Sequence, residues 1–224
     1  MSHQTLTITG TGKESLSPDR ITVNLTLSAK NADYSALMSL EAEKLAELTE
    51  ALVDTGFDKN DIKTSSFKIQ TEYENYEIEN NTRKRRFSGY SVNHGLSFAF
   101  DYDMELLSQV ISAISSCKKA SPVFNIGFEV NDKKAALDRL LKAAVMDAKR
   151  KACAIAEAAD LNLKKMESIV SEGYEPNFTS NTLMCRAAGE TEMFRGTAAI
   201  DITPVDIIAE TSVTVVWNAE SKDK

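Results

Sequence analysis

The chain has 224 residues, of which 42% are hydrophobic, and its 33 acidic side chains outnumber its 26 basic ones to give a net charge of −7. A chain of this length buries roughly 70% of its unfolded surface, so we expect one domain over residues 1–224, with 1–130 and 131–224 as candidate subdomains. The acidic balance disfavours binding to phosphate polymers or anionic membranes. No segment approaches the roughly 18 consecutive apolar residues of a membrane helix, so we expect no membrane insertion.

The N-terminal sequence MSHQTLTITGTG contains neither the basic nor the apolar region that a secretory signal has. It predicts a cytoplasmic protein, unless an export signal has been removed, in which case the cell envelope or periplasm is expected. The three cysteines, Cys117, Cys153 and Cys185, are an odd number, and two of them fall on predicted helices. We therefore expect reduced, mostly buried thiols and no disulfide framework.

The first quarter of the chain predicts two strands and a helix. A strand is indicated over residues 6–8, and Gly10 and Gly12 predict a bend after it. Strict alternation predicts a second strand whose apolar face is formed by Ile21, Val23, Leu25, Leu27 and Ala29. Asp33 is expected to cap a helix that ends near Gly56. Its inward positions at helical spacing are Leu37, Met38, Leu45, Leu48 and Leu52.

Residues 56–100 predict a hairpin with a highly charged tip. If Asn80 and Asn81 form the turn, the residues opposite His94, Val92 and Tyr90 are Phe67, Ile69 and Thr71, in that order. A slip of one residue would separate the two apolar faces. The same register places Glu77 opposite Lys84. It also brings the acidic side chains of one arm close to the basic side chains of the other, with Glu72, Glu74 and Glu79 near Arg83, Arg85 and Arg86. Attraction between the two arms modestly stabilises the hairpin.

A helix after Asp103 and a strand over 126–130 complete the order β-α-β-β-α-β, the split βαβ arrangement. The longest helix is predicted over 133–159, where ten of the 25 residues from Ala135 to Ala159 are alanine, which lets another backbone approach closely. One side of it is expected to carry Leu137, Leu140, Leu141, Ala144, Ala148, Ala152, Ile155 and Ala159. Strands over 166–171 and 207–217 follow. The prediction is an α+β fold with a mainly antiparallel sheet and three packing helices.

Several segments resemble the SIMPL domain family, and together they cover nearly the whole chain. They are ITGTGKESLSPDRITVNLTL, GFDKNDIKTSSFKI, GYSVNHGLSF, the helix AALDRLLKAAVMDAKRKACAIAEAADLNL with SIVSEGY after it, and ITPVDIIAETSVTV. The resemblance implies an α+β fold in a family that is often bacterial and exported to the cell envelope, with oligomerisation and no accepted catalytic residues. Many relatives have Gly where this chain has Asp160, Lys164 and Val205; we expect Asp160 to adopt a left-handed cap.

Few residues carry a signal for chemistry. The run 10–13 lacks the Gly, and the Ser or Thr, that a phosphate-binding loop requires. His94 is interpreted as a hydrogen-bonded core histidine, with a proton switch as the alternative. Cys153 is interpreted as a small buried thiol, with redox sensitivity as the alternative. The acids of the turn and hairpin are interpreted as solvated, because acid–base catalysis needs environments that separate two pKa values. We expect no catalytic residue, metal site or cofactor.

We expect a non-enzymatic protein that self-associates or binds a protein partner, with an envelope or stress role implied by the resemblance. The assembly surface is predicted on the hairpin, at Glu72, Glu74, Tyr76, Glu77, Glu79, Arg83, Lys84, Arg85 and Arg86. The weakly periodic stretch Gly173–Ala198 is expected to add a second contact through Arg186, Glu190 and Arg195. One alternative is an enzyme or small-ligand binder closed by that stretch. Another is weak nucleic-acid binding through 83–86, which the opposite acids disfavour.

Overall fold

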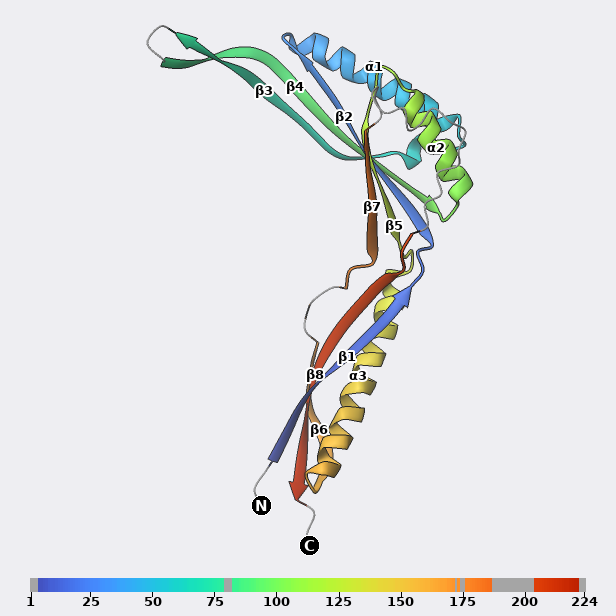
Figure 1. The fold of residues 1–224 in the computed structure, drawn as a ribbon, viewed down its shortest axis with the longest axis vertical. Coiled ribbons are helices and arrows are strands. Elements are labelled where there is room, and N and C mark those ends of the chain that lie inside the picture. The colour runs from blue at the N-terminus through green and yellow to red at the C-terminus, as the bar shows by residue number, and fades with distance from the viewer. Residues whose placement is uncertain (1–3, 79–81, 172, 174–175, 187–203, 222–224) are drawn as a thin grey trace. The chain divides into compact units, whose positions relative to one another are not determined.

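The computed structural model shows an α+β protein whose strands form two separate sheets (Figure 1). The residues that the structure describes are 4–78, 82–171, 173, 176–186 and 204–221. The predicted fold class is confirmed: three α-helices pack on the sheets, and the strand pairs β1–β8, β2–β4, β3–β4 and β6–β8 are antiparallel. The strands divide between a five-stranded and a three-stranded sheet, where a single sheet was expected.

The five-stranded unit comprises Asp19–Phe128 and Asn181–Pro204. Its elements are β2 (Arg20–Asn31), α1 (Tyr34–Val53), the short helix Lys59–Asp61, β3 (Lys63–Ile78), β4 (Thr82–Asp101), α2 (Met104–Ser116), β5 (Val123–Glu129) and β7 (Thr179–Arg186). The strand order β3-β4-β2-β5-β7 contains the predicted β-α-β-β-α-β segment. Helices α1 and α2 share one core with β2, β4 and β5, so both cover the same face. Asp33 caps α1 as predicted, accepting a hydrogen bond from the Ala36 N–H at 2.8 Å.

The three-stranded unit comprises Met1–Pro18, Glu129–Ser180 and Val205–Lys224. Its elements are β1 (Gln4–Leu16), α3 (Lys133–Ala158), β6 (Leu161–Ser171) and β8 (Ile207–Ser221), with the strand order β1-β8-β6. Helix α3 packs on one face of this sheet, and the predicted alternation of β8 is confirmed, since Ile207, Ala209, Thr211, Val213, Val215 and Trp217 are all buried. Asp160 adopts the expected left-handed conformation after α3, with φ of 54°.

The buried side of α3 follows a spacing of four residues. Its members are Ala136, Leu140, Ala144, Ala148, Ala152 and Ala156. Two predictions were therefore wrong: Ile155 is 44% exposed and Ala159 is exposed, because the sheet lies along one i, i+4 ridge of the helix. Cys153 is exposed for the same reason, since it directly follows a residue of the ridge and therefore points away from the sheet. The buried-thiol interpretation of Cys153 is thus corrected.

Gly10 and Gly12 lie inside β1, which runs unbroken to Leu16, so the predicted bend was wrong. A Cβ atom on Gly10 would lie 2.1 Å from the carbonyl oxygen of Ala144, and one on Gly12 would lie 2.0 Å from that of Leu140. Both distances are far below van der Waals contact. The two glycines therefore allow the backbones of β1 and α3 to touch, and the small side chains of the α3 ridge serve the same approach.

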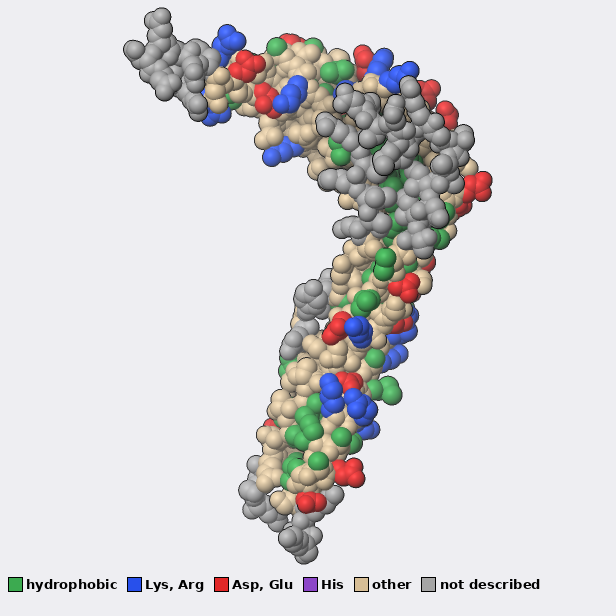
Figure 2. Space-filling view, in the orientation of Figure 1, with side chains coloured by type: hydrophobic (Ala, Val, Ile, Leu, Met, Phe, Trp, Pro, Cys, Tyr) green, Lys and Arg blue, Asp and Glu red, His purple; other side chains and the backbone are tan. Residues whose placement is uncertain are grey.

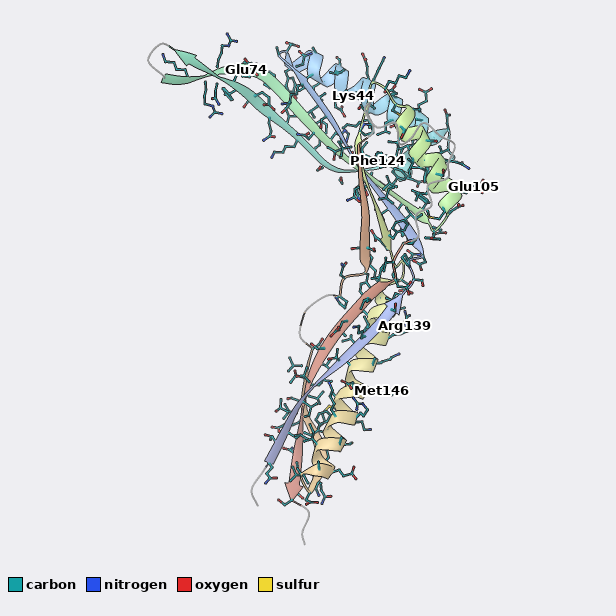
Figure 3. All side chains as sticks on the ribbon, in the orientation of Figure 1. Lys44, Glu74, Glu105, Phe124, Arg139 and Met146 are labelled. Atoms are coloured by element: carbon teal, nitrogen blue, oxygen red, sulfur yellow. The ribbon has the colours of Figure 1, made fainter. Side chains whose placement is uncertain are left out.

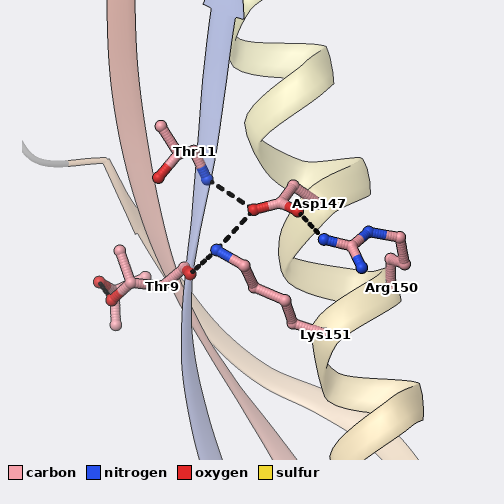
Figure 4. Close-up of polar contacts among 6 residues, drawn as sticks. Thr9, Thr11, Asp147, Arg150 and Lys151 are labelled. Atoms are coloured by element: carbon pink, nitrogen blue, oxygen red, sulfur yellow. Dashed lines mark hydrogen bonds and ion pairs between the residues drawn. The ribbon is translucent and has the colours of Figure 1, made fainter.

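Two side chains of α3 cover the outer edge of β1 (Figure 4). The Thr11 N–H donates to Asp147 Oδ2 at 3.0 Å, and Lys151 Nζ donates to the Thr9 carbonyl at 3.2 Å. Asp147 also pairs with Lys151 and Arg150, each at 2.7 Å. Lys151, the Thr11 N–H and Arg150 together hold the pKa of Asp147 well below its usual range. An edge strand exposes unpaired backbone groups, and here the helix supplies partners for two of them.

We predict that Gly10→Ala lowers the free energy of unfolding by at least about 2 kcal/mol, because the added methyl group collides with the α3 backbone. Gly173→Ala is the matched control, since a Cβ there meets nothing within 4 Å. Urea denaturation followed by circular dichroism measures both. Equal stability of the two variants would contradict the close approach of β1 and α3.

Asp147→Asn is expected to reduce stability at neutral pH and to have little effect in acid. A carboxyl group whose pKa is depressed on folding contributes stability above its unfolded pKa of about 3.9, and that contribution is lost as the pH falls through the folded value. The difference in unfolding free energy between wild type and variant should therefore shrink below about pH 4. Asp138→Asn, at an exposed position of the same helix, is the control. A difference independent of pH would contradict the assignment.

Candidate functional site: the charged ribbon and the buried histidine

The first candidate site is the part of β3 and β4 that extends past the end of β2. The last residue of β2, Asn31, lies opposite Tyr90 of β4. Beyond that point the register joins residues 72–78 of β3 only to residues 82–89 of β4, and this pair of segments is called the ribbon (Figure 1). A two-stranded hairpin is at best marginally stable alone in water. The ribbon therefore gains stability from a further contact.

The predicted register is confirmed as far as the base of the ribbon. Phe67 faces His94, Ile69 faces Val92, and Thr71 faces Tyr90. Above Glu72 the register shifts by one residue. As a result Glu77 lies opposite Arg83, and the predicted pairing of Glu77 with Lys84 was wrong.

A β-bulge causes the shift. Glu72 faces Gly89 and Tyr73 faces Phe87, which leaves Ser88 without a place in the ladder. Gly89 has φ of +144°, and a Cβ there would lie 2.5 Å from the carbonyl oxygen of Asn31. Only glycine satisfies both conditions. The bulge therefore fixes the point at which the ribbon leaves the sheet.

Charges of both signs line the ribbon (Figure 2). Glu74, labelled in Figure 3, pairs with Arg86 across the strands at 3.6 Å, as expected from the unlike charges of the two arms. Glu72 was expected near the basic arm, and it pairs instead with Lys30 of β2 at 3.3 Å because it lies below the bulge. A hydrogen bond from Ser91 and the Lys30 ammonium lower the pKa of Glu72. Exposed pairs of this kind contribute little stability, so most of this charge remains available to a partner.

Exposed aromatic rings form a chain along the base of the ribbon. Tyr34 contacts Tyr90 with ring centroids 5.5 Å apart, Tyr90 contacts Phe87 at 5.1 Å, and Phe87 contacts Tyr73 at 6.0 Å. The Arg85 guanidinium lies 5.1 Å from the centre of the Tyr73 ring. Tyr34 and Tyr73 are each 48% exposed and Phe87 is 45% exposed. Rings left this open supply contact area for another molecule.

A groove of about 370 Å³ opens beside these rings. Its lining includes Lys30, Glu72, Tyr73, Glu74, Gly89 and Tyr90. Its lining thus includes two tyrosines, two glutamates and one lysine. Such a groove favours a ligand that carries positive charge and flat or apolar surface, for example an arginine-rich segment.

The structure brings together only some of the predicted site residues. Glu74 and Arg86 pair, Arg85 stacks on Tyr73, and Lys84 lies opposite Tyr76. The backbone alone is described for Tyr76, Glu77 and Arg83, and Glu79 lies outside the described residues. The groove residues Lys30 and Tyr90, and Tyr34, whose ring contacts Tyr90, were not predicted as part of the site. The alternation of β4 predicted that Tyr90 lies on its apolar face, but no sequence signal places Tyr90 next to Tyr34.

The second predicted contact, Gly173–Ala198, contains a strand that the sequence pattern did not indicate. Residues Thr179–Arg186 form β7 at the edge of the five-stranded sheet, next to β5. Arg186 is the last residue of that strand, and its side chain is not described. Glu190 and Arg195 lie outside the described residues, so the loop contact stays a prediction.

A second candidate site is the buried pair formed by His94 of β4 and Glu41 of α1. His94 Nδ1 lies 2.5 Å from Glu41 Oε1, and both residues are 5% exposed. On the other side of the ring, His94 Nε2 lies 2.9 Å from the hydroxyl oxygen of Thr64 on β3. Phe67 packs edge-on against the imidazole, with centroids 4.9 Å apart. The expectation of a hydrogen-bonded core histidine is confirmed. The sequence pattern did not predict its carboxylate partner, Glu41.

With Glu41 ionised, the two hydrogen bonds assign one tautomer to the neutral ring of His94. A carboxylate can only accept, so Nδ1 carries the proton that is shared with Glu41. In the neutral ring Nε2 is then an acceptor, and Thr64, which is exposed, donates its hydroxyl proton to it. The three side chains thus form a directed chain from solvent to the core, Thr64 to His94 to Glu41.

We predict that Glu41→Ala lowers the free energy of unfolding by about 3 kcal/mol, because it leaves the polar ring of His94 buried without its partner. Glu43→Ala is the matched control, since Glu43 is an exposed glutamate on the same helix. Chemical denaturation at neutral pH measures both variants. A loss below about 1 kcal/mol for Glu41→Ala would contradict a buried and paired carboxylate.

The cysteines and acids give no further site in the part of the chain that the structure describes. Burial and the nearby Glu47 carboxylate raise the pKa of the Cys117 thiol to about 11, so it is unreactive at neutral pH. No group of three or more His, Cys, Asp or Glu side chains among the described residues is placed to hold a metal ion. None of the described helices is long and apolar enough to cross a membrane.

Comparison with known proteins gives one family and two similar relatives. The family model described as "SIMPL: Protein of unknown function (DUF541)" matches residues 6–217. A 26 kDa periplasmic immunogenic protein of Brucella melitensis is 24% identical over 165 residues, which are 73% of this chain and 65% of that protein. The protein of the same name from Brucella abortus has the same identity and coverage. The chain thus matches about 65% of the length of these curated relatives.

Proposed function

Because this chain belongs to the SIMPL family, in which no molecular function is assigned, we propose a function from its geometry: self-association through the ribbon, without catalysis at that site. The observation that carries the proposal is the extension of β3 and β4 past Asn31, where the described ribbon has neither a third strand nor a covering helix. A ribbon of this kind is stabilised when a second chain covers it.

Charge complementarity favours a second copy of this chain as the partner. The β3 arm carries Glu72 and Glu74, and the β4 arm carries Lys84, Arg85 and Arg86. If the β4 arm of one copy lies against the β3 arm of the next, unlike charges face each other and the backbone groups of the two ribbon edges can pair. The basic arm then meets the groove lined by Glu72, Glu74 and Tyr73, whose carboxylates and ring suit guanidinium groups. Contacts of this head-to-tail type give a ring where the rotation between copies closes and a filament where it does not, whereas an isologous contact gives a dimer.

The cell envelope is the proposed location. The two Brucella relatives are named as periplasmic proteins, and this supports an envelope setting for the present chain. Cell fractionation with the natural gene product tests the location, and recovery with cytoplasmic markers alone would contradict it.

Under the self-association proposal, the stretch Gly173–Ala198 provides a second contact between copies, through Arg186, Glu190 and Arg195.

We predict that deleting residues 75–86 lowers the mass of the assembled particle without unfolding the core, because the deletion removes the contact and leaves the β2–β4 ladder intact. Light scattering on a size-exclusion column at several protein concentrations and two salt concentrations gives the mass. Wild type should form a discrete multimer that weakens as salt screens the charges. An unchanged mass after the deletion, or a wild-type monomer at every concentration, would refute the proposal.

Charge exchange between two variants makes the test specific. Glu72→Lys with Glu74→Lys is one variant, and Arg85→Glu with Arg86→Glu is the other. Each alone should assemble less than wild type, and a mixture of the two should recover mixed assemblies, since unlike charges then meet between copies. Lys165→Glu, at an exposed position of β6, is the control for net charge. Failure of the mixture to recover assembly would count against the head-to-tail contact.

A further inference from the structure

The buried pair of His94 and Glu41 has the geometry of a base and its orienting carboxylate, with an exposed hydroxyl group attached. Nucleophilic catalysis requires a nucleophile within hydrogen-bond reach of a base, and a third group that orients the base. Thr64 Oγ1, His94 Nε2 and Nδ1, and Glu41 Oε1 meet these requirements at 2.9 Å and 2.5 Å. The three residues come from β3, β4 and α1, so the fold itself brings them together.

We propose that Thr64 is a nucleophile, activated by His94 and positioned through Glu41, which accepts acyl groups from activated esters. Thr64 is the exposed end of the chain, while His94 and Glu41 are each 5% exposed. A reagent can therefore reach the hydroxyl oxygen while the base remains screened from water. The proposal is independent of self-association through the ribbon.

The step is an acyl transfer. Thr64 Oγ1 forms a bond to the acyl carbon while its proton moves to His94 Nε2. The bond between the acyl carbon and the leaving oxygen breaks, and the leaving group departs with the electron pair, as a phenolate in the case of a phenyl ester. The imidazolium is stabilised by the Glu41 carboxylate on Nδ1 until its proton is released to solvent. The product is an acyl-threonine ester.

An apolar groove points to an acyl chain as the substrate. A groove of about 470 Å³ runs along α1, and its lining includes Glu41, Leu45, Ala46, Thr49 and Val53. Glu41 lines this groove and also contacts His94, so the groove adjoins the chain Thr64–His94–Glu41, although neither Thr64 nor His94 lines it. A medium-length acyl chain lying in this groove would bury apolar surface at about 0.8 kcal/mol for each CH₂ group. We therefore assign longer acyl chains as better substrates than acetyl.

The test uses the full chain with p-nitrophenyl acetate and p-nitrophenyl octanoate. Release of p-nitrophenolate gives the rate, and mass spectrometry of the intact protein and of its peptides locates the acyl group. We expect one acyl group on Thr64 and a higher rate with octanoate. Thr64→Val should abolish this product, Thr64→Ser should retain it, and Thr71→Val, on the same strand, should react as wild type. Acyl groups spread over several hydroxyl or lysine side chains, or equal rates with the two esters, would overturn the proposal.

Variants of the two buried residues separate chemistry from folding. His94→Ala should lower the rate at Thr64 by about 100-fold, the usual contribution of a general base, and added imidazole should restore part of it. Glu41→Gln keeps a hydrogen-bond acceptor next to Nδ1 but removes the carboxylate charge that stabilises the imidazolium. It should therefore lower the saturating rate and leave the ester concentration at half-saturation unchanged. If His94→Ala does not fold, Glu41→Gln and Thr64→Val still decide the question. A wild-type rate in a folded Glu41→Gln protein would refute the positioning role.

Discussion

The register between β3 and β4 determines which side chains of these two strands lie under the helices. Strand β4 is 20 residues long, and its alternation allows only one face to lie under the helices. That face carries Val92, His94, Leu96 and Phe98, all buried. A slip of one residue would expose these four side chains and bury the polar ones between them. Because His94 lies within this face, the register that buries the core of the unit also brings His94 into contact with α1.

Two irregularities in the same strand pair then shape the two candidate sites. One register shift lies between Thr64 and Ser66, and the other between Glu72 and Tyr73. The first falls beside the hydroxyl group that reaches His94, and the second falls where the ribbon leaves the sheet. β-Bulges redirect side chains and end regular pairing, and they are over-represented next to functional sites. The two candidate sites therefore lie at the two places where this ladder departs from regular geometry.

The sequence predicted the regular parts of the fold, because apolar alternation and helix caps are local signals. The facing of Phe67 and His94, the cap at Asp33 and the buried face of β8 all follow from such signals. The bulge at Ser88 could not be predicted by counting residues from the turn, because one extra residue leaves the hydrophobic pattern below it unchanged. Gly10 and Gly12 were misread for a related reason. A glycine required by a neighbouring backbone looks the same in sequence as a glycine required by a bend.

Glu41 shows what a sequence pattern misses and how it can be found. It lies four residues after Leu37 and seven before Leu48, on the stripe of α1 that is buried. A glutamate at such a position is normally assigned to solvent, so its partner on another element stays hidden until the strands are in register. Replacing a buried ion pair by well-packed apolar residues is often neutral or stabilising. Stability alone therefore gives little reason for Glu41 and His94 to be charged or polar at the core of α1 and β4. A requirement for chemistry at the exposed hydroxyl of Thr64 supplies a reason that packing does not.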